Sequence, residues 1–363
     1  MVRTIDFQKK NVRAVSPYIS ARDRYKKGLF LDANEHFEQW MQINWSNIMR
    51  LNRYGDSSCE ELREKLCEKY IPNFTKENVF IGAGSNEIID LLIRGFVEPE
   101  EFIMAVEPTY TIYSIQASVA GVRCKKLHYD SNLSIPISSI RENMQGVKIL
   151  FLCSPNNPTG RIISSNVLET ILSFYKGIVI IDEAYIEFLG LDKSLVGFAH
   201  RSNVVITRSF SKAWGLAGIR VGYAIGCKKI IDVLLKIKNP YNVSKISQLI
   251  VMQALDQIDR MHESVSRSNN LKNALVEKLK TLPIDVFSTE ANYILIRLNN
   301  AAKIQKTLAE KQIIVRDRGN LPLLKNILRI SVGSADENKK FIVALTEIIE
   351  TTQSSTPNTD MSG

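Results

Sequence analysis

Short apolar runs alternate with helical stretches between residues 79 and 226, and this alternation constrains the fold more than any other feature. Mostly apolar strands separated by helices are typical of a largely parallel sheet with helices on both faces. We therefore predict an α/β fold with a mostly parallel seven-stranded sheet in a large domain. The seven runs are 79–84, 102–106, 122–129, 147–153, 177–181, 204–207 and 221–225.

The segments on either side of these runs have different patterns. Residues 1–45 show little periodicity and predict an N-terminal arm, which either lies over another subunit or domain or is a plain surface segment. The large domain is predicted to span 46–250. Strand-like runs and helical stretches in 251–350 predict a smaller α+β domain, with runs at 284–287, 292–298, 313–316 and 327–332. Residues 351–363 have almost no apolar content and predict a disordered tail.

Lys212 follows two closely spaced serines, Ser209 and Ser211, and Arg220 follows it within the same segment. A lysine that forms a Schiff base needs a low pKa and a fixed aldehyde partner. If that partner carries a phosphate, hydroxyl groups and an arginine can hold it. The tetrapeptide alone is a weak signal that more often marks a solvated loop lysine, so the segment needs support from the rest of the chain.

A second candidate for phosphate binding follows the first predicted strand. Gly84 leads into Ser85 and Asn86, either of which can cap the helix predicted over 88–96. A glycine before a helix N-terminus lets backbone N–H groups approach an anion, and the helix dipole favours phosphate there. Glu87 stands where a dinucleotide-binding sequence would have its third glycine, which argues against such a site. A tight strand-to-helix turn without a ligand is the alternative.

Polar or reactive side chains follow four of the predicted strands: Tyr110, Asn157, Asp182 and Lys212. Ligands of parallel sheets bind at the carboxyl ends of the strands. If a pyridine ring lies there, Asp182 can keep its nitrogen protonated, and Tyr110 can stack on its face. Asn157 and Tyr185 can hydrogen-bond the phenolic oxygen of the ring. Each residue alone has an ordinary alternative, such as a core aromatic or a turn former, but their joint occurrence favours the cofactor.

Composition excludes several other classes of function. The formal net charge of +9 is spread over short separate runs without interleaved aromatics, so we expect no nucleic-acid partner. No apolar run is long enough for a signal peptide or a membrane span, and we expect no membrane partner. The five cysteines lack metal-ligand spacing and fit reduced thiols of a cytoplasmic protein, and no metal is expected.

Several longer motifs resemble the fold-type I, class II pyridoxal-phosphate aminotransferases, and within them the histidinol-phosphate aminotransferase family. The resemblance covers about residues 12 to 350. The motifs of the superfamily are GAGSNE (82–87), SPNNPTG (154–160), DEAY (182–185) and SFSKAWGLAGIRVGY (209–223). Those that favour the narrower family include VSPYISAR (15–22), LDANE (31–35), LNRYGD (51–56), EPTYTIYS (107–114), TEANYILIR (289–297), IIVRDRG (313–319) and LRISVG (328–333).

The resemblance implies a role for each matching residue. Lys212 forms the Schiff base with pyridoxal 5'-phosphate and moves the proton, and Asp182 and Tyr185 complete the catalytic set. The cofactor-binding residues it implies are Gly84, Ser85, Asn86, Tyr110, Asn157, Asp182, Tyr185, Ser209, Ser211, Lys212, Arg220 and, from the other subunit of a homodimer, Tyr54. The substrate-binding residues it implies are Tyr18, Asn34, Arg316 and Arg329.

The resemblance implies transamination between histidinol phosphate and 2-oxoglutarate, giving imidazole acetol phosphate and glutamate in histidine biosynthesis. The chain departs from the family at 36–40, HFEQW, where a proline and small residues usually follow Asn34 and Glu35. This segment lies on the substrate side, so an aminotransferase or decarboxylase for another small phosphorylated amine or amino acid is an alternative. A non-catalytic pyridoxal-phosphate-binding protein and a nicotinamide-dependent oxidoreductase are alternatives of other classes.

Overall fold

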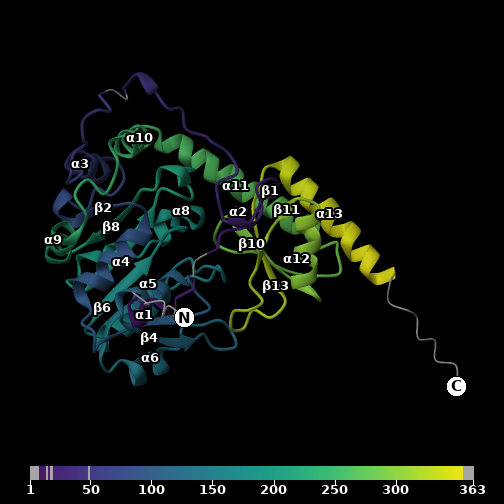
Figure 1. Cartoon of the computed structure of the whole chain (residues 1–363), viewed down its shortest axis with the longest axis horizontal. Helices are drawn as coiled ribbons and strands as arrows, with labels where there is room; N and C mark the ends of the chain where they lie inside the picture. The colour runs from purple at the N-terminus through teal and green to yellow at the C-terminus, as the bar shows by residue number, and fades with distance from the viewer. Residues whose placement is uncertain (1–7, 14, 17–18, 48–49, 355–363) are drawn as a thin grey trace, which may run out of the picture.

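The computed structural model describes residues 8–13, 15–16, 19–47 and 50–354. Its larger part is built on a seven-stranded sheet in the order β2-β8-β7-β6-β5-β3-β4 (Figure 1). Within this sheet only β8 runs antiparallel to its neighbours, so the predicted α/β class with a mostly parallel seven-stranded sheet is confirmed. The strands are β2 Val79–Gly82, β3 Phe102–Glu107, β4 Arg123–His128, β5 Val147–Cys153, β6 Ile178–Asp182, β7 Val204–Ser209 and β8 Gly222–Gly226.

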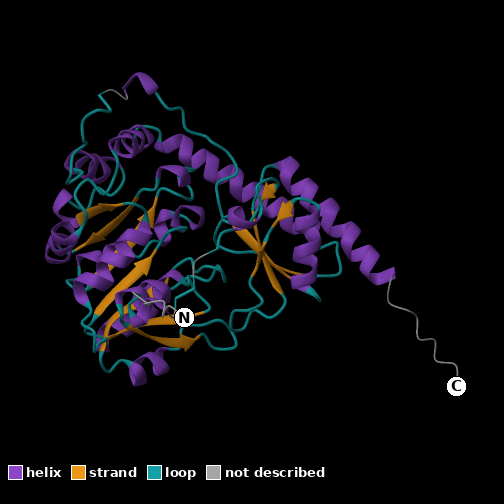
Figure 2. Cartoon of the chain, viewed as in Figure 1, coloured by secondary structure: helices purple, strands orange, loops and turns teal. Residues whose placement is uncertain are grey.

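Helices cover both faces of this sheet, as Figure 2 shows. Alternate residues of one strand point to opposite faces of the sheet. In β5, Ile149 and Phe151 belong to one buried apolar cluster, and Leu150 and Leu152 belong to the other. Burial on both faces explains why these strands are continuous apolar runs. The first cluster includes α4 Ser85–Phe96, α5 Ile112–Ala120 and α9 Lys228–Ile237, and the second includes α3 Glu60–Lys69, α7 Ser165–Phe174 and α10 Lys245–Leu255.

The smaller part contains a four-stranded antiparallel sheet in the order β12-β13-β10-β9. Its strands agree with the predicted runs, except that 313–316 divides into β11 and β12. Three helices share its apolar cluster. The elements are β9 Asp285–Phe287, β10 Tyr293–Arg297, β11 Ile313–Ile314, β12 Arg316–Asp317, β13 Ile327–Ser331, α11 Ile258–Leu279, α12 Ala301–Glu310 and α13 Ala335–Ser354. The exact division between the two predicted domains stays a prediction.

The N-terminal segment runs to the smaller part of the molecule. It contains α1 Lys10–Arg13, α2 Ala21–Arg24 and β1 Leu29–Phe30. Strand β1 pairs in parallel with β11, and the Leu31 carbonyl then accepts the Ser331 N–H at 2.9 Å. These bonds carry residues 32–34 to the carboxyl edge of the seven-stranded sheet.

Two boundaries differ from the sequence prediction. Helix α4 begins at Ser85 rather than at residue 88, because Gly84, with φ of 79°, turns the chain out of β2 directly into the helix. Helix α13 extends to Ser354, past the predicted start of the tail at 351. The hydroxyl of Thr351 donates to the Glu347 carbonyl within this last turn, and residues 355–363 lie outside the described residues.

The remaining described α-helices are short connections, α6 Ile137–Asn143 and α8 Ile186–Leu189. Helix α8 follows β6 after a few residues and so places Tyr185 at the sheet edge. Among the residues that the structure describes, no helix combines the length and the apolar character needed to cross a bilayer.

Candidate active site

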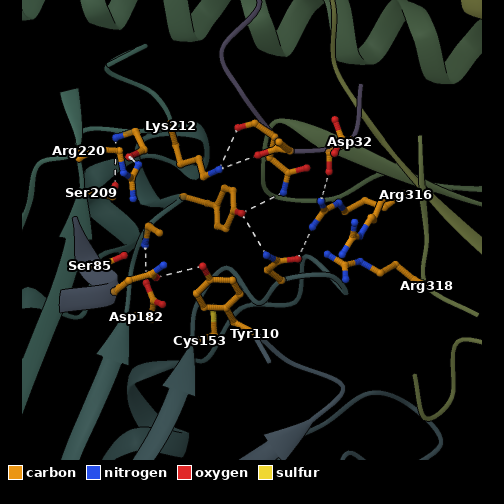
Figure 3. Close-up of a pocket in the computed structure, with 18 residues that line it drawn as sticks. Asp32, Ser85, Tyr110, Cys153, Asp182, Ser209, Lys212, Arg220, Arg316 and Arg318 are labelled. Carbon is orange, nitrogen blue, oxygen red and sulfur yellow. Dashed lines mark hydrogen bonds between the residues drawn. The ribbon is translucent and has the colours of Figure 1, made fainter. Parts of the chain in front are cut away.

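A cavity of about 190 Å³ lies where the carboxyl ends of the parallel strands meet the N-terminal segment and the smaller sheet (Figure 3). It brings together side chains that are widely separated in the sequence. Its lining residues are Asp32, Ala33, Asn34, Ser85, Asn86, Tyr110, Cys153, Asn157, Asp182, Ala184, Tyr185, Ser209, Ser211, Lys212, Arg220, Arg316, Arg318 and Arg329.

Lys212 follows β7 and points its amine into this cavity. Its Nζ donates to the carbonyl oxygens of Ala33 at 2.9 Å and Asn34 at 3.3 Å. Burial and then the Arg329 guanidinium lower the pKa of Lys212 to about 8. A substantial fraction of this amine is therefore neutral near physiological pH, which is what a nucleophilic or basic lysine requires.

Asp182 ends β6 and lies deep in the same cavity, with 3% of its surface exposed. Tyr113 donates to its Oδ2 at 2.7 Å, and the Ala184 N–H donates to its Oδ1 at 3.1 Å. Burial raises the pKa of Asp182, although these two hydrogen bonds favour the ionised form. A cationic group placed against Asp182 would offset that burial.

The Tyr185 hydroxyl is the centre of a chain of hydrogen bonds across the cavity. It accepts from the Asn34 amide at 3.0 Å and from the Asn157 amide at 3.2 Å. The other end of Asn157, its Oδ1, accepts from Arg329 Nη1 at 2.7 Å. Tyr185 is buried and its pKa is raised to about 12 by that burial. The chain thus couples the strand ends to β13 of the smaller sheet.

One end of the cavity has the features of an anion site. Helix α4 begins there with Ser85 and Asn86, so its free N–H groups and its dipole favour negative charge. Arg220 Nη1 donates to the Ser211 hydroxyl at 3.2 Å. A Cβ on Gly84 would lie 2.8 Å from Arg220 Nη2, so glycine allows the arginine to approach the helix start. Nearby, the Tyr110 hydroxyl donates to Asn86 Oδ1 at 3.1 Å.

The opposite end carries the guanidinium groups of Arg316 and Arg318 (Figure 3), and Arg329 lines the same cavity. Asp32 is the carboxylate among them, with 6% of its surface exposed. Burial raises the pKa of Asp32, and Arg22, Arg316 and Arg329 oppose that rise. Arg329 Nη2 also donates to the Asp32 backbone carbonyl. The net positive charge at this end suits a second anionic group.

The structure therefore brings together the predicted residues of the large domain and two of the substrate-side arginines, but not every predicted residue. Tyr54 has 79% of its surface exposed, stacks on Tyr241 and does not line the cavity of its own chain. Tyr18 lies outside the described residues. Gly84 does not line the cavity, but its lack of a side chain lets Arg220 approach the start of α4.

Some lining or supporting residues escaped the sequence analysis. Asp32 and Ala33 were only part of a motif, Cys153 and Ala184 had no polar signal, and Arg318 is two residues beyond Arg316 in the sequence. Tyr113 is the partner of Asp182. It lies in α5 three residues after Tyr110, which precedes that helix, and the two rings meet edge to face with centroids 5.7 Å apart.

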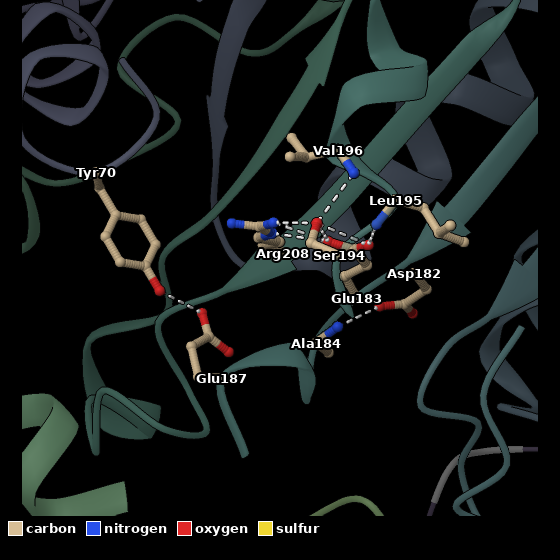
Figure 4. A network of polar contacts seen from close by, with 9 residues as sticks. All are labelled: Tyr70, Asp182, Glu183, Ala184, Glu187, Ser194, Leu195, Val196 and Arg208. Carbon is tan, nitrogen blue, oxygen red and sulfur yellow. Dashed lines mark hydrogen bonds and ion pairs between the residues drawn. The ribbon is translucent and has the colours of Figure 1, made fainter. Parts of the chain in front are cut away.

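A network of buried charges lies behind the strand ends (Figure 4). Arg208 on β7 forms an ion pair with Glu183, whose carboxylate also accepts from Ser194 and from the Leu195 N–H. Glu187 on α8 accepts from the Tyr70 hydroxyl at 3.3 Å. Because Glu183 adjoins Asp182 and Glu187 lies two residues after Tyr185, this network supports the segment that carries both site residues.

Comparisons with known proteins bear directly on this arrangement. The family model described as aminotransferase class I and II matches residues 28–345. The chain belongs to this family. The predicted recognition and the predicted enzyme class are confirmed, so the reading as a nicotinamide-dependent oxidoreductase and the non-catalytic reading are both excluded.

Among the aminotransferases, the chain is similar in sequence and in structure to histidinol-phosphate aminotransferases. The chain is 35% identical to the histidinol-phosphate aminotransferase of Parabacteroides distasonis, over 94% of this chain and 97% of that protein. It is 36% identical to that of Caldanaerobacter subterraneus, over 88% and 92%. The structure of the Clostridium acetobutylicum histidinol-phosphate aminotransferase gives a TM-score of 0.81 at 27% identity, over 89% of this chain and 99% of that chain. The Sinorhizobium meliloti structure, a complex with pyridoxal 5'-phosphate, gives 0.84 at 19% identity, over 96% and 99%, and so supports the fold.

Proposed function

We propose that this aminotransferase uses pyridoxal 5'-phosphate to transfer the amino group of histidinol phosphate to 2-oxoglutarate. The products are imidazole acetol phosphate and glutamate, as in L-histidine biosynthesis. The observation that carries the proposal is the Lys212 amine with its lowered pKa, placed in one cavity between two cationic ends. Curated relatives at 34–36% identity over most of the chain are histidinol-phosphate aminotransferases, which supports this choice of substrate.

The residues present fit the cofactor. The start of α4, Ser209, Ser211 and Arg220 would hold its phosphate, and Lys212 would bond to its aldehyde. Asp182 would pair with the ring nitrogen, and the cation there would offset the burial that raises the pKa of this carboxyl. Asn157 and Tyr185 would hydrogen-bond the phenolic oxygen, and Tyr110 would stack on the ring face. When bound, the ring withdraws electrons from the substrate's α-carbon and makes its proton acidic.

The protein's own residues then position and move the proton. Lys212 takes it as a neutral amine and returns it within the same cavity, which its lowered pKa allows. Tyr185 is fixed by Asn34 and Asn157, so the polar groups beside the reacting atoms need not reorganise.

The arginine end would bind the other anionic groups of the substrates. Arg316 and Arg329 would hold the phosphate of histidinol phosphate and, in the second half-reaction, the distal carboxylate of 2-oxoglutarate. Asn34 would close this end from the N-terminal segment, and Tyr18 is proposed to join it.

We also propose a homodimer, in which Tyr54 reaches the cofactor phosphate of the partner subunit. On its own chain this tyrosine is largely exposed and stacks on Tyr241, so the two rings form a patch of exposed aromatic surface. A patch of this kind is typical of a subunit interface. The five free cysteines fit a cytoplasmic location.

A substrate screen of the purified protein tests this proposal. Histidinol phosphate with 2-oxoglutarate should yield glutamate at a higher kcat/KM than aspartate, an aromatic amino acid or threonine phosphate does. Release of CO₂ from threonine phosphate without glutamate formation would establish the decarboxylase alternative instead. Borohydride reduction followed by peptide mapping should place the cofactor on Lys212, and a label on another lysine would refute the assigned site.

A further inference from the structure

Residues 33–40, which we call the strap, contact the catalytic lysine and its loop at two separate points. At the front of the strap, the carbonyls of Ala33 and Asn34 accept hydrogen bonds from Lys212 Nζ at 2.9 and 3.3 Å. At its back, Trp40 Nε1 donates to the Ala213 carbonyl at 3.2 Å. The strap therefore holds both the side-chain end and the backbone of the lysine.

The front of the strap is fixed to the smaller sheet. The Asn34 N–H donates to the Ser331 hydroxyl at 2.8 Å, and the Asn292 amide donates to the Asn34 and Glu35 carbonyls at 3.1 and 3.2 Å. Asn34 has a left-handed φ of 52°, which asparagine tolerates better than most residues. This turn presents two consecutive carbonyls to the same amine.

The back of the strap, residues 36–40, is fixed by contacts with α11 and α8. Glu38 accepts hydrogen bonds from Ser264 and Arg267 on α11, with Arg267 Nη2 at 2.6 Å. His36 stacks on Phe188 of α8, with ring centroids 6.2 Å apart. Trp40 has 5% of its surface exposed.

The lysine loop has a local conformation that admits the strap. Gly215 has φ of 65°, and a Cβ there would lie 3.3 Å from both the Glu38 carbonyl and Trp40 Nε1. A larger residue would therefore be strained by its backbone and would press on the strap. Loop and strap fit each other closely at this point.

We propose that the strap acts as a clasp that orients the Lys212 amine for proton transfer, with Trp40 as a positioning residue. A neutral primary amine has two N–H bonds and one lone pair. The two strap carbonyls take both N–H bonds, so the lone pair is left to receive the substrate proton. The inference rests on the proposed role of Lys212 and is independent of which amine is the substrate.

The clasp also explains why the amine is neutral so readily. Burial is the main cause of the lowered pKa of Lys212, and the strap covers the amine from the side of the smaller sheet. Arg329 and Arg220 lower this pKa further, whereas Glu35 of the strap and Asp182 raise it, so burial outweighs the charge that the strap itself brings. Loosening the strap would admit water, which stabilises the ammonium form. The pKa of Lys212 should then rise toward its ordinary value.

Trp40→Phe tests this, because it removes the indole N–H and keeps an aromatic ring in the core. Trp45→Phe, at a position with 65% exposure, is the matched control. In cofactor-free protein, the rate at which an amine-selective acylating reagent labels Lys212 is measured against pH by peptide mass spectrometry. Wild type and control should inflect near pH 8, and Trp40→Phe about one pH unit higher.

Each outcome of the labelling experiment either supports or overturns the proposed role of the strap. An unchanged inflection in folded Trp40→Phe, even with a lower melting temperature, would leave the strap a purely structural role and overturn the proposal. If that variant does not fold, Glu38→Gln replaces it, since this side chain is partly exposed, and a smaller upward shift is required. Failure of histidinol phosphate to react would refute the proposed substrate but would leave this labelling result intact.

Discussion

The two halves of the active-site cavity are built in different ways. The half proposed to bind the cofactor consists of residues at the carboxyl ends of strands of one sheet, such as Asp182 as the last residue of β6 and Lys212 after β7. The substrate half is assembled from the N-terminal segment, β12 and β13, so that Asp32 and Arg329 meet across 297 residues of sequence. The residues of the first half are positioned by one sheet alone, whereas those of the second half are positioned by the contact between two parts of the molecule.

This contrast predicts that variants of the cofactor half slow every reaction, while variants of the substrate half distinguish one substrate from another. The hydrogen bond from Arg329 to Asn157 joins the two halves, so the separation is not complete at that position.

The largest effect is expected from Lys212→Ala, because this change removes both the nucleophile and the base. We expect kcat to fall by at least about 10⁴-fold for every amine donor. The fold should be intact, since the change removes a buried amine that costs stability in its charged form. Steady-state rates with two donors, together with circular dichroism, measure this. Turnover within tenfold of wild type would rule out the assigned role.

Asp182→Asn should have the next largest effect, because it preserves size and removes the charge that pairs with the cofactor ring. We expect kcat to fall by about 100-fold or more, by a similar factor for all donors. Tyr113→Phe is the graded control, since it removes one hydrogen bond to the same carboxylate and should cost less. If kcat fell for only one amine donor, the prediction that this half of the cavity affects all substrates equally would be wrong.

Arg316→Gln should affect substrates selectively. Loss of a charged hydrogen bond is worth about 1.5–3 kcal/mol, so KM for histidinol phosphate should rise about 10- to 100-fold while kcat changes less. Histidinol, which lacks the phosphate, should lose little. Arg22→Gln is the matched control, because Arg22 pairs with Glu35 and does not line the cavity. Equal losses for histidinol and its phosphate would place Arg316 outside the phosphate site.

The same contrast explains what could be predicted from the sequence. In the cofactor half each residue lies within a short motif at the end of a recognisable strand, so Tyr110, Asn157, Asp182 and Lys212 were found by position alone. In the substrate half, Asp32 and Arg318 lie within the motifs 31–35 and 313–319 but were given no role, because they reach the cavity only when β1 pairs with β11 and β12 pairs with β13. Long-range pairing of this kind is invisible to a reading based on periodicity.

The strap illustrates the same limit. The unusual residues 36–40 were recognised as a departure, but their contacts with α11 and the lysine loop depend on tertiary packing. Tyr54 is a different case, since its predicted role is at the site of the partner subunit and its own chain leaves it largely exposed.

The smallest effect is expected for stability, from the buried charges that support the cofactor half (Figure 4). Burial raises the pKa of Glu187 to about 7, with Arg208 opposing the rise. The folded state therefore binds this proton more tightly than the unfolded chain, whose pKa is 4.5, and wild type loses stability as pH rises from 4.5 through 7. Glutamine cannot titrate, so Glu187→Gln should gain in melting temperature relative to wild type between pH 5 and pH 8, by about 2–4 °C.

Glu183→Gln should have the opposite effect on the melting temperature. Glu183 is the buried ion-pair partner of Arg208, and its loss leaves the guanidinium without that charge at either pH. Its melting temperature should fall at both pH 5 and pH 8. If Glu187→Gln instead loses stability at pH 8, Glu187 is ionised in the folded protein and shares the charge of Arg208. The segment that carries Asp182 and Tyr185 would then depend on two carboxylates rather than one.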